Sequence, residues 1–158
     1  MWWPTWGACV IERRAVLRAG ACVGWAVYAQ PVLGAPPDLS AAIAKFAKTA
    51  PVRVGKVTLD VAELVDNGNT VPLRVSVASA MTPDDHVLAI ALFNEKNPQR
   101  EVALFRLGPW AGRAIVQARI RLATSQKIVA VAHMSDGSFW SQTVDVIVTL
   151  AACIEEPI

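Results

Sequence analysis

The sequence is poor in the residues that enzyme and metal sites usually need. It contains two histidines, His86 and His133, and neither stands at metal-ligand spacing from a cysteine or from the other histidine. It has no glycine-rich phosphate loop, and no histidine is aimed by a third group at the serines of MSDGSFW, residues 134–140. These absences argue against a metal site, a nucleotide site and a hydrolase. We therefore expect no catalytic residue, metal ligand or cofactor, and we interpret MSDGSFW as a hairpin turn followed by packed aromatic residues.

Long apolar runs are also scarce, although 54% of the residues are hydrophobic. The run from Ala19 to Ala29 is too short to span a bilayer core of about 30 Å as a helix. It follows Arg13, Arg14 and Arg18 and precedes proline, glycine and alanine, which is the pattern of a secretory signal. The segment ERRAVLR resembles the twin-arginine signature.

We therefore expect residues 1–35 to be a twin-arginine-type signal peptide, with a retained membrane anchor as the alternative. Cleavage after Ala29 and after Ala35 are both open, and Ala35 is favoured. The remaining protein would be periplasmic and would not contact the membrane after cleavage.

A surplus of positive charge is missing from the expected mature chain. The sequence has 15 basic and 13 acidic residues, and removing three arginines and Glu12 with the leader leaves 12 of each. Nucleic-acid binding needs a cationic face that neutralises phosphates. No nucleic-acid partner is therefore expected.

Cysteine is scarce too, and its placement is informative. Cys9 and Cys22 would leave with the signal, so Cys153 would be the one thiol of a protein in an oxidising compartment. An odd cysteine there is either a reactive group or half of an intermolecular disulfide. A third interpretation is a cysteine buried as a small hydrophobe, because the surrounding LAACI is apolar.

The rest of the chain predicts one helix followed by strands. DLSAAIAKFAKTA, residues 38–50, has apolar residues at helical spacing, with Asp38 or Ser40 as N-cap and Pro51 as a stop, and we expect it to cover one end of a core. From Val52 onward the period changes to two. The predicted strands are Val57–Val61, Val71–Val77, Val87–Phe93, Glu101–Leu107, Ala114–Leu122, Gln126–Met134 and Thr143–Leu150.

Turn residues separate these strands and favour antiparallel pairing. Asn67-Gly68-Asn69 and Asp136-Gly137 tolerate positive φ, and prolines mark two other turns. About seven short strands at ten-residue spacing predict an all-β fold, an immunoglobulin-like β-sandwich with a short N-terminal helix after the signal peptide. The expected divisions are residues 1–35 (signal), 36–150 (sandwich) and 151–158 (a C-terminal cysteine arm).

Several segments resemble the SoxY family, the sulfur carriers of thiosulfate oxidation. They are DNGNTVPLRVSV, MTPDDHVLAIALFNEKNPQREVALFRL, ARIRLATSQKIVAVAHMSDGSFW and the final strand leading to a lone cysteine. The resemblance implies a sandwich that pairs with a second small sandwich, SoxZ, as a heterodimer. It also implies that Cys153 carries sulfur intermediates covalently and that periplasmic enzymes load and unload it.

The arm departs from the family's Gly-Gly-Cys-Gly-Gly ending and is similar to a divergent SoxY-related group that ends in Ala-Ala-Cys-Ile-Glu. Ala151 and Ala152 precede the cysteine, and Ile154 and Glu155 follow it. This tail is stiffer and bulkier than a glycine tail. Glu155 and Glu156 should also disfavour the thiolate and repel anionic adducts.

Two functions remain open at this point. The first is a non-catalytic carrier holding a covalent, sulfur-containing intermediate on Cys153. The alternative is a structural or interaction module whose cysteine is packed or forms an interchain disulfide. A self-sufficient enzyme is not expected.

Overall fold

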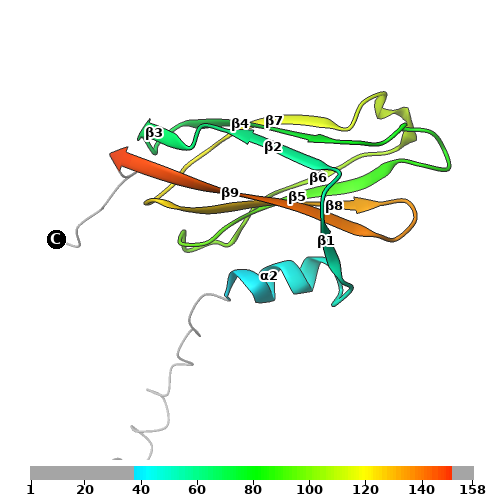
Figure 1. Ribbon diagram of the computed structural model, residues 1–158, viewed down its shortest axis with the longest axis horizontal. Helices are drawn as coiled ribbons and strands as arrows, with labels where there is room; N and C mark the ends of the chain where they lie inside the picture. The colour runs from blue at the N-terminus through cyan, green and yellow to red at the C-terminus, as the bar shows by residue number, and fades with distance from the viewer. Residues whose placement is uncertain (1–37, 151–158) are drawn as a thin grey trace, which may run out of the picture. The chain divides into compact units, whose positions relative to one another are not determined.

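The computed structural model describes residues 38–150, which form two β-sheets packed face to face, with a helix outside one of them (Figure 1). The chain divides into two compact units, residues 1–35 and 36–158, and every described residue lies in the second. The elements are α2 (Leu39–Phe46), β1 (Val52–Val54), β2 (Val57–Val61), β3 (Leu64–Asn67), β4 (Val71–Val77), β5 (Val87–Asn94), β6 (Glu101–Arg106), the 3₁₀ turn η1 (Pro109–Ala111), β7 (Ile115–Ile120), β8 (Gln126–Met134) and β9 (Phe139–Leu150). The predicted β-sandwich with a short N-terminal helix is confirmed.

β9 organises the larger sheet because it pairs along both of its edges. The strand order of this sheet is β1-β9-β8-β5-β6, and β3 also pairs with β9. β8 is antiparallel to β9, whereas β1 and β3 are parallel to it, β1 at its start and β3 at its end. Between these two short strands the chain passes through β2, which belongs to the smaller sheet, β2-β4-β7. The side chain of Gln142 in β9 accepts a hydrogen bond from the backbone N–H of Leu59 in β2 at 2.7 Å, so the two sheets are joined along this side.

The main core lies between the two sheets. In β4 the alternation VPLRVSV places four side chains inside and leaves Pro72 and Arg74 outside, because successive strand residues point to opposite faces. The inward residues include Val71, Leu73, Val75 and Val77 of β4, Ile90 and Leu92 of β5, Ile128 and Ala130 of β8, and Val146 of β9. The period of two in the sequence thus predicted this core correctly.

A second apolar cluster lies on the outer face of the larger sheet, under α2. Asp38 caps the helix, with its carboxylate accepting from the Leu39 N–H at 2.8 Å. Phe46 packs edge-on against Phe93 of β5 and Phe139 of β9, with ring centroids 6.0 and 5.8 Å away. The expectation that this helix covers one end of the core is wrong, because it lies on the sheet face instead.

The position of α2 explains the composition of β5 and β8. Ile90 and Leu92 of β5 face the core between the sheets, and Ala91 and Phe93 face the helix. Strands covered on both faces become continuously apolar instead of alternating. The run VLAIALFN in β5 is therefore buried at seven of its eight positions.

The structure differs from the sequence expectation in its turns and its short strands. Gly137 has φ of 81° in the turn between β8 and β9, as expected, but none of residues 67–69 has positive φ. Gly68 is buried instead, and its N–H donates to the Leu150 carbonyl at 2.9 Å.

β1 and β3 were not predicted, because strands of three or four residues carry too little alternation to be recognised. β9 also begins at Phe139, earlier than the predicted Thr143, because the hairpin turn pairs it with β8 at once.

Candidate functional site

The predicted site residues lie outside the described residues, and the structure shows the strand that leads to them. β9 ends at Leu150, where the predicted strand also ends. The residues concerned are Ala151, Ala152, Cys153, Ile154 and Glu155 of the predicted arm and Arg13 and Arg14 of the predicted signal motif.

The end of β9 is held by hydrogen bonds on both sides. On the β3 side, the Ile147 N–H donates to the Glu63 carbonyl at 2.7 Å, and the Leu150 carbonyl accepts from the Gly68 N–H. On the other side, the Val148 N–H donates to the hydroxyl of Ser125 at 2.9 Å. β9 is bonded on the β8 side as far as Val148 and on the β3 side as far as Leu150, so the residues that follow begin from a strand held almost to its end.

A buried polar network fixes the loops beside this end of β9. The Gln126 side chain, at the start of β8, accepts from the backbone N–H groups of Lys96 and Asn97 and donates to the Asn97 side chain at 2.7 Å. Asn97 in turn donates to the Arg121 carbonyl and accepts from the Ala123 N–H. The β5–β6 and β7–β8 connections are therefore locked together. The hydrogen bonds of both amide side chains hold these loops, so we assign Gln126 and Asn97 a structural role and no role in binding or catalysis.

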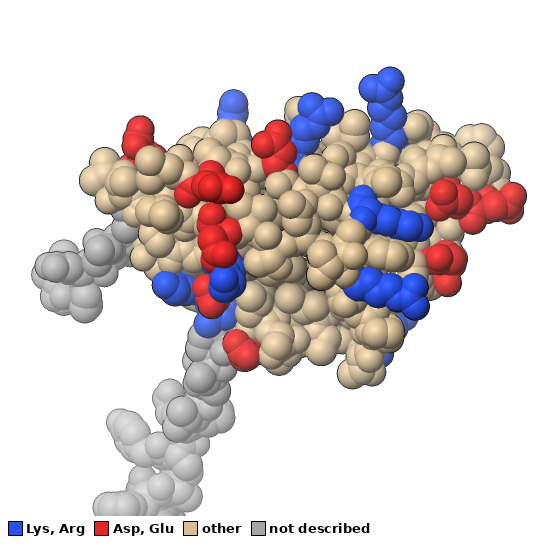
Figure 2. Space-filling model, in the orientation of Figure 1, with Lys and Arg blue, Asp and Glu red and all other residues tan. Residues whose placement is uncertain are grey.

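Carboxylates predominate around the outer face of the β3–β9 end. Asp145 pairs with Lys127 across β9 and β8 at 2.7 Å, and both side chains are exposed. The hydrogen bond and the charge of Asp145 raise the pKa of Lys127, and the charge of Glu95 adds to this. Glu63 and Asp66 are exposed nearby on β3 and the turn before it. Figure 2 shows Asp and Glu side chains across this end of the molecule, with Lys and Arg side chains beside the lower ones.

Two large apolar side chains are exposed at the same place. Leu64 of β3 and Ile147 of β9 are direct partners in the parallel ladder, and they are 62% and 59% exposed. Leu150 is 67% exposed at the end of the strand. Sequence reasoning missed Leu64 and Ile147, although a signal existed: Ile147 is an apolar residue at an outward position of a strand whose inward residues are Val144, Val146 and Val148.

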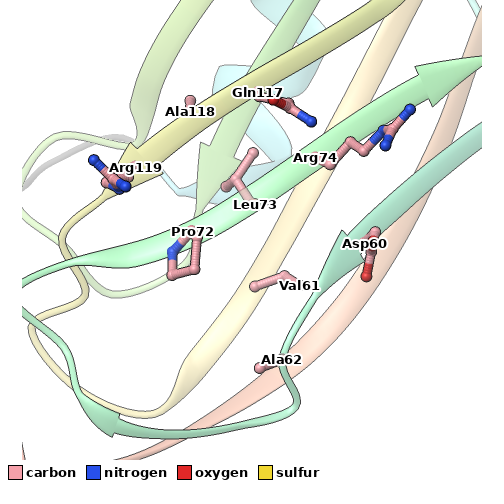
Figure 3. Close-up of a pocket in the computed structure, with 9 residues that line it drawn as sticks. All are labelled: Asp60, Val61, Ala62, Pro72, Leu73, Arg74, Gln117, Ala118 and Arg119. Atoms are coloured by element: carbon pink, nitrogen blue, oxygen red, sulfur yellow. The ribbon is translucent and has the colours of Figure 1, made fainter.

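A hollow on the outer face of the smaller sheet is a second candidate site. It is lined by Asp60, Val61 and Ala62, Pro72, Leu73 and Arg74, and Gln117, Ala118 and Arg119 (Figure 3). Its polar groups are two guanidinium groups, one carboxylate and one amide. These can bind an anion or a polypeptide through hydrogen bonds, and the lining includes no serine, threonine, cysteine, lysine or histidine.

The two histidines have structural roles, as the sequence suggested. His133 stacks on Phe139 with ring centroids 4.4 Å apart. A ring nitrogen of His86 is 3.0 Å from the Thr82 carbonyl in the β4–β5 turn. Within residues 38–150, no three histidine, cysteine, aspartate or glutamate side chains come together to hold a metal ion. The described helices are also too short to cross a bilayer.

Comparison with known families adds the decisive observation. The family described as "Sulfur oxidation protein SoxY" matches residues 43–153, which cover most of the sandwich and end at Cys153. The chain belongs to the SoxY family. Among solved structures, the sulfur carrier protein SoxY from Chlorobium limicola f thiosulfatophilum is 25% identical and has a TM-score of 0.61, covering 72% of this chain and 97% of that one.

Other solved structures share the SoxY-type sandwich without showing a function for this chain. A superoxide reductase (neelaredoxin) from Ignicoccus hospitalis is 17% identical with a TM-score of 0.53, covering 60% of this chain and 80% of that one. A putative superoxide reductase from Thermotoga maritima is 20% identical with a TM-score of 0.52, covering 65% and 89%. At sequence identities this low, the match shows a shared fold and nothing about function. No curated protein matches the chain.

Proposed function

We propose that this protein is a periplasmic SoxY-like carrier that holds a covalent, sulfur-containing intermediate on Cys153. The observation that carries the proposal is the family match, whose last residue is Cys153. The anchored end of β9 supports it, because Cys153 is the third residue after Leu150 and their Cα atoms can be at most about 11 Å apart. A thiol so close to a rigid base can be presented to an enzyme while the sandwich stays intact. The protein is then a carrier and not a self-sufficient catalyst.

The chemistry of loading can be stated without naming the cargo. If the Cys153 thiolate attacks an S–S bond of a donor, one S–S bond breaks, another forms on Sγ, and the displaced sulfur leaves as a thiolate. If instead the thiol is joined to a sulfur that is not already in an S–S bond, two electrons and the thiol proton must be removed. The loading enzyme must then supply a two-electron acceptor.

We further propose that the chain belongs to the divergent SoxY-related group that ends in Ala-Ala-Cys-Ile-Glu, and residues 151–155 of the sequence support this. Ala151 and Ala152 restrict the backbone where the family has glycine, and Ile154 and Glu155 add bulk and charge. These changes favour a cargo or an enzyme different from that of the glycine arm. Ile154 would be an apolar anchor in the enzyme, and Glu155 would meet a basic residue.

The proposal includes a domain arrangement and a partner. Residues 1–35 are a twin-arginine-type signal peptide, residues 36–150 the sandwich and residues 151–158 the arm. A small SoxZ-like β-sandwich subunit pairs with the sandwich, since family membership implies such a partnership in general. Periplasmic enzymes load and unload Cys153.

Intact mass spectrometry of the protein purified from the periplasm tests the carrier function. The wild type should carry an additional mass on Cys153 that a reductant removes. Cys153→Ser should carry none, yet it should still co-purify with its sandwich partner, because that contact uses the sheets. A Cys153 that is always a free thiol, even with the relevant enzymes present, would end the carrier hypothesis.

The alternative function is an interaction module in which Cys153 forms an interchain disulfide. It is favoured by one observation, namely that residues 36–158 contain no second cysteine to form an internal bond. A covalent dimer at full stoichiometry on a non-reducing gel of periplasmic protein would favour this alternative. A monomer band with an adduct mass would favour the carrier.

A further inference from the structure

The exposed pair Leu64 and Ile147, here called the arm-root patch, has no structural role within the described sandwich. Both side chains point away from the core, because Val65 and Val148, their neighbours along the two strands, pack inward. α2 covers a different part of the same sheet face, over Phe93 and Phe139. Two adjacent aliphatic side chains that are each about 60% exposed cost hydration free energy in the isolated protein.

The place of the patch on the fold suggests what covers it. Ile147 lies three residues before Leu150, the last residue of β9, and Cys153 follows three residues later. An enzyme that takes Cys153 into its active site must therefore place the mouth of that site against this end of the sandwich.

The charges around the patch define the partner's chemistry further. Asp66, Glu63 and Asp145 are exposed on the same two strands and the turn before β3, and Glu95 lies beside Lys127. Lys127 is already paired with Asp145. Two further exposed cations lie at this end, Lys96 next to Glu95 and Arg121 next to Leu122, whose N–H donates to the Gly68 carbonyl. Glu155 and Glu156 add negative charge to the sequence of the arm. The complementary surface is apolar at its centre and basic at its rim.

We propose that the arm-root patch is the docking surface for the enzymes that load Cys153, and that these enzymes present an apolar contact ringed by lysines and arginines around the active-site mouth. This inference rests on the proposed carrier function. The patch holds the enzyme by burying Leu64 and Ile147, and the carboxylates speed the encounter. Docking therefore orients the end of β9 against the enzyme before the Cys153 thiol enters the enzyme's active site.

The experiment measures the rate at which Cys153 is loaded, using the mature chain with its partner subunit. The probe is fresh periplasmic extract of the organism that makes this chain, supplied with thiosulfate, sulfite or sulfide in separate reactions, and the adduct is followed by intact mass spectrometry. The test variant is Leu64→Thr with Ile147→Thr, which keeps strand-compatible residues in both strands while removing most of the apolar surface. The matched control is Val54→Thr, since Val54 is 85% exposed on β1, which pairs with the opposite end of β9.

We expect the double variant to load at least tenfold more slowly than the wild type, and Val54→Thr to load at the wild-type rate. Loading by a polysulfide solution exchanges S–S bonds without docking, so it should be equally fast in all three proteins. If the double variant loads as fast as the wild type in extract, the patch is not a docking surface, although the carrier function stands. If its polysulfide and extract rates fall together, the substitutions affect the arm itself, and the docking proposal is wrong. If the wild type acquires no adduct in extract, the carrier function fails, and this inference fails with it.

Charge reversal gives an independent measure of the basic rim. Glu63→Lys with Asp66→Lys should slow loading several-fold at low ionic strength, and the difference should shrink in high salt, because exposed charges are screened. Asp84→Lys is the control, since Asp84 lies against Ser135 in the turn that precedes β9, at the opposite end of the strand. Equal loading of the charge-reversed double variant and the wild type at low salt would contradict a basic rim.

Discussion

Gln126 shows how a single polar residue can position the candidate site. It is 4% exposed, and its side chain binds two backbone N–H groups and the Asn97 side chain. Replacing it with leucine keeps the volume but leaves the Lys96 and Asn97 N–H groups without a partner.

We expect Gln126→Leu to lower the free energy of unfolding by about 1–3 kcal/mol, because a buried donor that loses its acceptor is costly. Urea denaturation followed by circular dichroism measures this. Gln117→Leu, at an exposed position on β7, should stay within about 0.5 kcal/mol of the wild type. Equal stability of the two variants would mean that the network does not hold this end of the sandwich.

His133 makes the stability of the protein depend on pH. Burial against Phe139 is the main cause that lowers its pKa from the ordinary 6.5; the charge of Lys48 lowers it further, and Asp136 opposes the shift. Between the lowered native pKa and 6.5, the unfolded chain binds more protons than the native protein. The contribution of His133 to the free energy of unfolding is therefore complete above about pH 6.5. It is lost as the pH falls toward the pKa that His133 has in the native protein.

The urea midpoint should accordingly decrease from pH 7.5 to pH 5.5, and His133→Gln should show a smaller decrease over the same range. Asp136 does not contribute in this window. Its pKa is lowered from 3.8, chiefly by hydrogen bonds from Ser138, so its effect appears only in more acidic solution. An unchanged pH dependence in His133→Gln would show that another group is responsible.

At the scale of elements, α2 stabilises the face of the larger sheet that the smaller sheet cannot reach. Its contribution depends on Phe46, which contacts Phe93 and Phe139 in edge-on geometry. We expect Phe46→Ala to cost about 2–4 kcal/mol, because it removes both aromatic contacts and opens the cluster beneath. Lys45→Ala on the same helix is the control and should cost little. Thermal unfolding of both variants measures the difference, and a Phe46→Ala protein as stable as the control would mean that α2 is only loosely attached.

The pairing of β1 and β3 with β9 also belongs to this scale. Neither strand was predicted, and together they show how β9 is held at both ends. β3 in particular places Leu64 beside Ile147, so the arm-root patch exists only through this pairing. The individual residues Leu64 and Ile147 were visible in the sequence, but their adjacency was not.

For the whole molecule, the prediction concerns export through the proposed twin-arginine signal of residues 1–35. We expect Arg13→Lys with Arg14→Lys to leave unprocessed precursor in the cytoplasm, because the twin-arginine signature depends on the paired arginines. Cell fractionation with immunoblotting measures the distribution of precursor and mature protein. Substitution of Arg18 by lysine, outside the pair, is the control. Normal processing of the double variant would exclude the twin-arginine route.

The sequence alone determined the strand faces, the core of the sandwich and the candidate residue. Val71, Leu73, Val75 and Val77 could be placed inside because a strand alternates with a period of two, whatever it pairs with. Cys153 could be selected because counting the cysteines that follow an expected signal peptide needs no coordinates. The turn at Gly137 was predictable for a similar reason, since its positive φ is a local preference of glycine.

Only the tertiary structure decided what lies beside what. Phe46 contacts Phe139 from the other end of the described chain, and Leu59 reaches Gln142 across 83 residues of sequence. No local pattern encodes such pairs, because they arise when separate strands find one another and bury a shared surface. The parallel pairing of β3 with β9, the helix on the sheet face and the Asn97–Gln126 network were settled in this way, and they give the end of β9 its rigid and acidic surroundings.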